Sequence, residues 1–144
     1  MKFRLWALAA ASLLSLPAFA RDTVLHIPLA DVFELPEAKD KLDPAFKFFL
    51  DGQALPKGVK RMGSDVSNPK TNGVGKSDDY GCKWAALSAL ISLQDTAKRQ
   101  GANAVVDIVS YYKKVEYKSA TDFECHAGAI IIGVALKGTY AKLP

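Results

Sequence analysis

The clearest pattern of apolar and polar positions predicts a long helix over about residues 79–100. Apolar side chains recur there at helical spacing and form one wide face, with a polar stripe opposite. Ser77 or Asp78 can cap the start, and Gly101 can end the helix in a left-handed conformation. The apolar face comprises Trp84, Ala86, Leu87, Leu90, Ile91, Leu93 and Ala97, and the stripe comprises Ser88, Ser92, Asp95 and Arg99.

Alternating residues before this helix predict two strands. Residues 23–29 place Leu25, Ile27 and Leu29 on one face and His26 on the other, where we interpret it as a partly exposed strand residue. Residues 45–50 alternate in the same way and predict the second strand.

Between and after these strands the pattern is less regular. Residues 31–42 indicate one or two short helical turns. Residues from about 54 to 78 are dense in Gly, Pro and Asn, which favours loops or one twisted edge strand.

Two more strands are expected after the helix, at residues 104–112 and 122–136, joined by a turn at 118–121. The last strand has one face that can pack under the helix. Its other face is small but apolar, so a neighbouring subunit or loops should cover it. The elements predict an α+β fold with one long helix packed on an antiparallel sheet of about four strands, the helix being followed by a C-terminal strand hairpin.

Residues 1–20 have the pattern of a secretory signal peptide. Lys2 and Arg4 precede an apolar run at residues 5–16, and residues 18–20 form a small-x-small cleavage site. The run is shorter than the roughly 20 residues that span a bilayer. Cleavage after Ala20 leaves Arg21, rather than a lipid-modified Cys, at the new terminus. We therefore expect a single domain of residues 21–144 that is periplasmic or secreted, is not a lipoprotein and does not span the membrane.

Removing this segment changes the composition. The whole chain carries 19 Lys+Arg against 15 Asp+Glu, a net charge of +4, and the loss of two basic residues leaves 17 − 15 = +2. A domain this weakly basic does not require nucleic acid as a partner.

The two cysteines, Cys82 and Cys125, form an even count in an exported chain, which favours a disulfide. The alternative is a metal or thiol-redox site that adds His126, although neither CxxC nor HxxxH spacing is present.

Positive charge is concentrated in residues 57–76, where five basic residues accompany one acid, Asp65. The segment is either a solvated loop or a surface for anionic groups of the cell envelope. It has no aromatic residue to stack on bases, which argues against single-stranded nucleic acid. The basic residues are Lys57, Lys60, Arg61, Lys70 and Lys76.

Residues 73–77, Gly-Val-Gly-Lys-Ser, match the second half of a phosphate-binding P-loop and lead into the helix. Lys70 occupies the position of the first P-loop glycine, and a polar, broken segment stands where a buried strand is required. The incomplete pattern argues against nucleotide hydrolysis. We also find no catalytic set of residues in the sequence and expect no cofactor.

Residues 82–136 resemble the YbjQ-like (heavy-metal-binding-domain-like) proteins and the related Rcs stress-sensor lipoprotein domain, most clearly at the Gly-Ala-Asn-Ala-Val-Val step of residues 101–106. The whole chain is similar to small exported proteobacterial proteins often labelled "excinuclease ATPase subunit". The resemblance implies one main helix against an antiparallel sheet. It also implies a disulfide from the helix start to a strand, with Cys82 and Cys125 in comparable places.

These observations lead to three hypotheses. The first is an exported, non-catalytic envelope module, stapled by a disulfide, that binds a periplasmic or outer-membrane partner or an anionic surface, or assembles with itself. The second is a metal-binding or thiol-redox protein using Cys82, Cys125 and His126. The third, which the label implies, is an ATP-binding excinuclease-like protein that depends on Lys76.

Overall fold

A computed structural model describes residues 21–144, so the predicted signal peptide lies outside the described residues. The described residues contain the following elements and the hydrophobic core between them. In chain order the elements are β1 (Thr23–Pro28), α1 (Leu29–Phe33), α2 (Pro36–Lys41), β2 (Lys47–Leu50), β3 (Lys60–Ser67), β4 (Lys70–Asn72), α3 (Asp78–Arg99), β5 (Ala104–Ser110), the 3₁₀ turn η1 (Tyr112–Lys114), β6 (Asp122–Ala127), β7 (Ile131–Gly133) and β8 (Leu136–Lys142).

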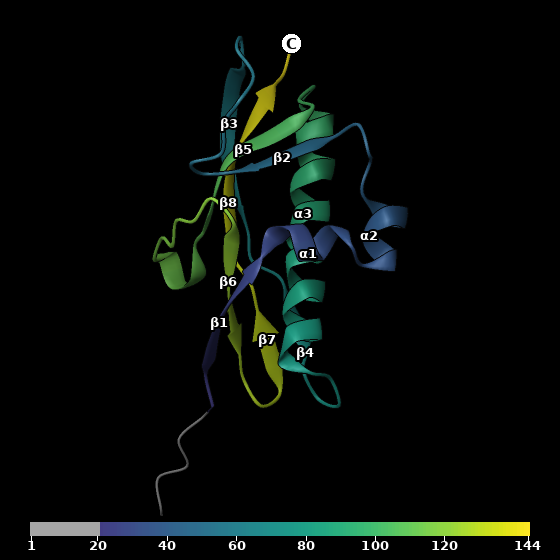
Figure 1. The fold of residues 1–144 in the computed structure, drawn as a ribbon, viewed down its shortest axis with the longest axis vertical. Coiled ribbons are helices and arrows are strands. Elements are labelled where there is room, and N and C mark those ends of the chain that lie inside the picture. Colours follow the sequence, from purple (N-terminus) through teal and green to yellow (C-terminus); the bar gives the residue numbers. More distant parts are fainter. Residues whose placement is uncertain (1–20) are drawn as a thin grey trace, which may run out of the picture.

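The strands form two four-stranded sheets, in the orders β1-β6-β7-β4 and β2-β5-β8-β3. All neighbouring strands are antiparallel except β2 and β5, which are parallel. Because β3 runs on into β4 and β7 into β8, the same two chain segments continue from one sheet into the other. The sheets follow one another along the long axis with α3 beside both (Figure 1). The predicted α+β fold is confirmed, with a mixed sheet in addition.

Helix α3 forms where its capping residues and pattern predict it. The Ser77 side chain accepts a hydrogen bond from the Tyr80 amide (3.2 Å), and Gly101 takes the left-handed conformation with φ of 80°. Its buried face is rich in alanine, which lets the helix approach both sheets closely. At Gly81 an added Cβ would collide with the end of the Ile132 side chain of β7.

A disulfide joins Cys82 of α3 to Cys125 of β6, with the Cα atoms 5.8 Å apart. Both residues are fully buried. The predicted pairing is confirmed: the bond closes a sequence separation of 43 residues and ties the helix start to the first sheet.

The prediction of one continuous strand over residues 122–136 is wrong. The Gly128 amide donates to the Ile131 carbonyl (2.8 Å), which closes a hairpin turn between β6 and β7. The loop of this turn is apolar, so the sequence lacks the polar residues that usually indicate a turn. Ile132 is therefore buried, whereas Ile130 and Ile131 are exposed.

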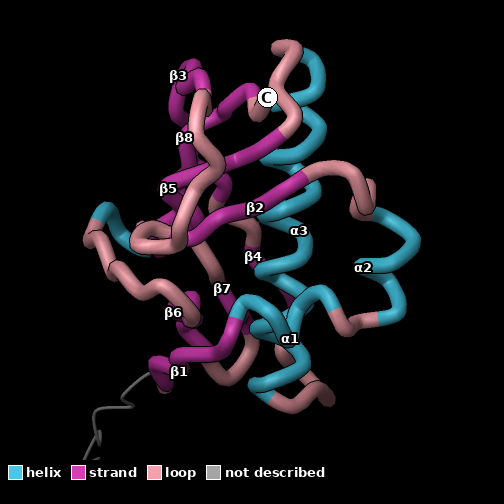
Figure 2. The backbone as a smooth tube through the Cα atoms, turned by 45° about the horizontal axis from the view of Figure 1, so that its top comes forward, coloured by secondary structure: helices cyan, strands magenta, loops and turns pink. Residues whose placement is uncertain are grey.

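Two segments, residues 136–142 and residues 54–78, contain strands that were not expected. Strand β8, which was not predicted, lies between β5 and β3 inside its sheet. Residues 54–78 hold two edge strands, β3 and β4, where at most one was expected. Figure 2 shows the short helices α1 and α2 beside α3, connecting β1 to β2. Within residues 21–144, no helix is long and apolar enough to cross a membrane.

We expect the variant C82A/C125A to unfold with a free energy lower by about 4 kcal/mol, because the bond restricts the unfolded chain. Urea unfolding followed by circular dichroism measures the difference. Intact mass under denaturing conditions is the companion measurement: the wild-type chain should gain two hydrogen atoms on reduction. A wild-type mass that does not change on reduction, or equal unfolding midpoints, would contradict the structural role of the bond.

Candidate functional site

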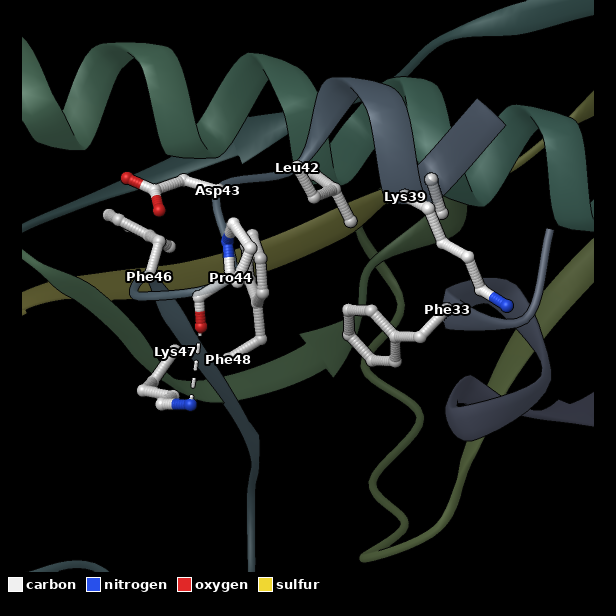
Figure 3. Close-up of a pocket in the computed structure, with 9 residues that line it drawn as sticks. Phe33, Lys39, Leu42, Asp43, Pro44, Phe46, Lys47 and Phe48 are labelled. Carbon is white, nitrogen blue, oxygen red and sulfur yellow. Dashed lines mark hydrogen bonds between the residues drawn. The ribbon is translucent and has the colours of Figure 1, made fainter. Parts of the chain in front are cut away.

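An apolar cavity of about 390 Å³ opens where α1, α2 and β2 meet. We call it the α2–β2 groove. Its volume lies within the range of small-molecule sites, and its wall is mainly aromatic and aliphatic (Figure 3). The lining residues are Phe33, Ala38, Lys39, Leu42, Asp43, Pro44, Phe46, Lys47 and Phe48.

The wall of the groove is anchored to α3 by a buried glutamine. The side-chain oxygen of Gln94 accepts a hydrogen bond from the Asp43 amide (2.8 Å), and its nitrogen donates to the Lys41 carbonyl (3.3 Å). Lys98, one turn further along α3, forms an ion pair with Asp43 at 2.7 Å. These bonds attach the connection between α2 and β2 to α3 at Gln94 and Lys98.

Phe33 of α1 and Phe48 of β2 form the floor, with ring centroids 6.0 Å apart. Phe46 packs on Phe48 at 5.1 Å. A second cavity of about 450 Å³ lies against the same two rings, Phe33 and Phe48, so the apolar surface continues past them. The second cavity is also lined by Pro28, Leu29, Ala30, Leu50, Gln53, Ala120, Thr121 and Asp122.

The rim of the groove is positively charged. Lys39 and Lys47 lie on either side of the two rings (Figure 3). The hydrogen bonds from Lys98 and from the Ala45 amide lower the pKa of Asp43, so this acid is ionised and already paired. Lys47 donates only to the Pro44 carbonyl (3.3 Å), and the contact of Lys39 with Glu34 is a long 3.9 Å between exposed groups.

A second cluster lies on the solvent-facing side of the first sheet, and we call it the histidine–glutamate cluster. Register places His26 of β1 opposite Glu124 of β6, and His126 is two residues further along the same face. The Glu124 carboxylate contacts His26 at 3.1 Å and His126 at 2.8 Å. Tyr117 stacks on His26 and Tyr112 stacks on His126, with centroids 4.2 Å and 3.8 Å apart.

Glu124 is the electrostatic centre of this cluster. Burial by itself would raise the pKa of Glu124, but the hydrogen bonds to His126 and His26 outweigh burial, so its pKa lies below the ordinary 4.5. The cluster therefore fastens β1 and the segment around η1 to β6. His26 is exposed on its strand, as expected, although the sequence did not indicate its glutamate and tyrosine partners.

The ligand set suggested for metal or redox chemistry does not come together. The sulfur atoms of Cys82 and Cys125 are bonded to each other, and His126 lies on the opposite face of β6 from Cys125. Among residues 21–144, no group of three or more His, Cys, Asp and Glu side chains has an arrangement that could hold a metal ion.

The five basic residues of segment 57–76 are distributed along the molecule and form no single patch. Lys60 is opposite Lys142 at the beginning of β3, whereas Lys70 is on β4 and Lys76 precedes α3. Arg61 forms an ion pair with Asp107 at 2.8 Å. Asp107 has a φ of 54°, where the pairing of β5 with β8 shifts.

The segment that resembles half of a P-loop forms a turn and a helix cap. Strand β4, which precedes it, is an edge strand of three residues antiparallel to β7. A P-loop instead follows a buried parallel strand. In this fold the Ser77 hydroxyl accepts a hydrogen bond from the Tyr80 amide, which caps the helix.

Sequence reasoning did not find the groove. Phe33 and Phe48 come from separate elements, and only the packing of α1 against β2 brings their rings together. One feature of the sequence could have indicated the groove. Residues 46–49 contain three phenylalanines, which is more than one buried face of a short strand can hold. Comparisons with protein-family models, curated proteins and solved structures found no match.

We expect Glu124→Gln to lower the free energy of unfolding by roughly 1–2 kcal/mol at pH 7, because a neutral amide weakens both histidine contacts. The pKa of Glu124 is lower in the folded state, so its contribution is present above about pH 4.5 and disappears as the pH falls through the folded-state pKa. Urea titrations at several pH values measure the difference. Glu34→Gln, at an exposed site, is the control, and a pH-independent deficit in Glu124→Gln would contradict this account.

Proposed function

We propose that this chain is an exported, non-catalytic binding module of the bacterial envelope, and that its α2–β2 groove binds an anionic amphipath with a single acyl chain. The observation that carries the proposal is the open aromatic groove between Lys39 and Lys47, anchored on α3 through Gln94.

The shape and chemistry of the groove support this ligand class. Phe33 and Phe48 offer apolar surface on both sides, because each lines both cavities. An acyl chain that lies across these rings is removed from contact with water. This burial of apolar surface is the main source of affinity in apolar sites. A carboxylate or phosphate at its end is then within the field of the rim lysines, whose acidic neighbour Asp43 is paired with Lys98.

The scaffold supports export and a role in binding. A structural disulfide is typical of proteins that fold in an oxidising compartment such as the periplasm. Cys82 and Cys125 are both fully buried, whereas the thiols of redox enzymes are partly exposed. The resemblance to the stress-sensor lipoprotein domain, which has a comparable disulfide, supports the same assignment.

We expect dodecanoate to bind with saturation at one equivalent, measured by isothermal titration calorimetry below its critical micelle concentration. K39E/K47E should weaken this binding by about tenfold or more, because two attractive charges become repulsive. Dodecyltrimethylammonium, with the same chain length and the opposite charge, should bind the wild-type protein more weakly than dodecanoate by a similar factor.

The matched control is K57E/K60E, which makes the same change in charge at residues that line neither cavity. It should leave dodecanoate affinity unchanged. Absence of saturable binding, equal affinity for the two amphipaths, or an equal loss in the control variant would each contradict the proposed ligand.

Export is tested separately from ligand binding. Expression of the full chain in a bacterial host should give a periplasmic product whose intact mass corresponds to residues 21–144 with the disulfide formed. Replacing Ala18 and Ala20 together by bulky Leu should block the cleavage, since the cleavage site requires small residues. A cytoplasmic product that retains residues 1–20 would contradict export.

A further inference from the structure

Two turns at one end of the molecule carry aliphatic residues where turns usually carry polar ones. The first turn precedes α3 and is closed by a hydrogen bond from the Lys76 amide to the Gly73 carbonyl (3.2 Å). Val74 occupies its second position, followed by Gly75 with φ of 74°. The Val74 side chain is 61 % exposed.

The second turn is the hairpin between β6 and β7. Ala129 and Ile130 form its loop between Gly128 and Ile131. Ile130 is 65 % exposed and Ile131 is 54 % exposed, although both are large aliphatic residues. Ile131 is the first residue of β7, and the two residues that follow it in this strand are buried.

The two turns are neighbours. The Gly73 amide donates to the Ile130 carbonyl at 2.7 Å, which fixes one turn beside the other. Both lie at the lower end of the long axis in Figure 1, where the β6–β7 hairpin and the loop between β4 and α3 project furthest. We call Val74, Ile130 and Ile131 the aliphatic tip.

The surroundings of the tip contain groups suited to a lipid interface. Tyr80, in the first turn of α3, is 39 % exposed, and the Trp84 ring stacks on it one turn further along, with centroids 6.4 Å apart. Tyr and Trp rings favour the boundary between acyl chains and headgroups. Lys76 lies in the first turn and is exposed, so it can contact lipid phosphates.

The point of attachment of residues 1–20 is at the same end. The Arg21 side chain donates to the Gly128 carbonyl (2.8 Å) and forms an ion pair with Asp78 (2.7 Å). The described part of the chain therefore begins beside the aliphatic tip.

We propose that the aliphatic tip inserts into the interface of a phospholipid bilayer, with Tyr80 at headgroup level, and attaches the domain peripherally. The occupant is lipid because the apolar residues are outermost on two narrow turns, with the Tyr80 and Trp84 rings and the exposed Lys76 beside them. Arg21 is balanced by Asp78, so insertion depends on apolar contact more than on anionic lipid. This inference does not depend on the ligand proposed for the α2–β2 groove.

The test uses residues 21–144, which contain every described element and the whole described core, and vesicles of phosphatidylethanolamine and phosphatidylglycerol. Co-sedimentation should show binding that persists in high salt. V74S/I130S/I131S should lower the partition coefficient by about tenfold or more. Trp84, the one tryptophan of this part of the chain, should shift its emission to shorter wavelength with vesicles only when the tip is intact.

The matched control is M62S/V66S/V115S, which removes three aliphatic side chains that are 43 %, 41 % and 68 % exposed elsewhere. It should bind vesicles as the wild type does. Circular dichroism and urea unfolding of both variants test whether the fold is retained.

Four results would overturn the inference, and the first three are no vesicle binding by the wild-type domain, equal losses in the two variants, and complete release by salt. Release by salt would assign attachment to the lysines instead. A dimer in lipid-free solution that V74S/I130S/I131S abolishes would assign the tip to self-association, and would also overturn it.

Discussion

The covalent link between Cys82 and Cys125 determines how the single long helix meets the sheets. It lies at the start of α3, where Gly81 also brings the helix backbone against Ile132 of β7. Beyond this end, the alanine-rich face of the helix packs on strands of both sheets. A larger residue at either contact would push the helix away from both sheets, because their strands are continuous with each other.

The groove depends on the other end of the same helix. Gln94 and Lys98 lie about three and about four turns beyond Cys82, and they hold the Asp43 backbone and carboxylate. Phe33 of the aromatic floor belongs to α1, which packs beside the first part of α3, where Asp31 and Lys83 are 3.9 Å apart. The groove is therefore held by α3 at two places: α1 lies beside the start of the helix, and the connection between α2 and β2 is bonded to Gln94 and Lys98.

The predictable part of this structure is local. Ser77, Gly101 and the apolar period define α3 within a residue or two, and an even cysteine count identifies the disulfide. The hairpin at residues 128–131 escaped prediction because its loop is apolar, and β8 because its residues alternate weakly between apolar and polar. In both cases tertiary pairing outweighs the local pattern.

The candidate sites show the same limit more strongly. His26 and Glu124 meet only because β1 pairs with β6 in one register, across 98 positions of sequence. Phe33, Phe48 and the rim lysines come from three elements whose relative placement no local pattern encodes. The five basic residues, which are close in sequence, are dispersed by β3 and β4 along the molecule.

The strand order has a consequence for how the chain is made. The first strand, β1, pairs with β6, β2 pairs with β5, and β3 pairs with β8, so each early strand waits for a partner from the last third of the chain. Such long-range pairing makes sheet formation slow and prevents it on a partial chain. A newly synthesised polypeptide of this sequence therefore completes neither sheet until nearly all of it has emerged, which leaves the edges of its early strands unpaired until then.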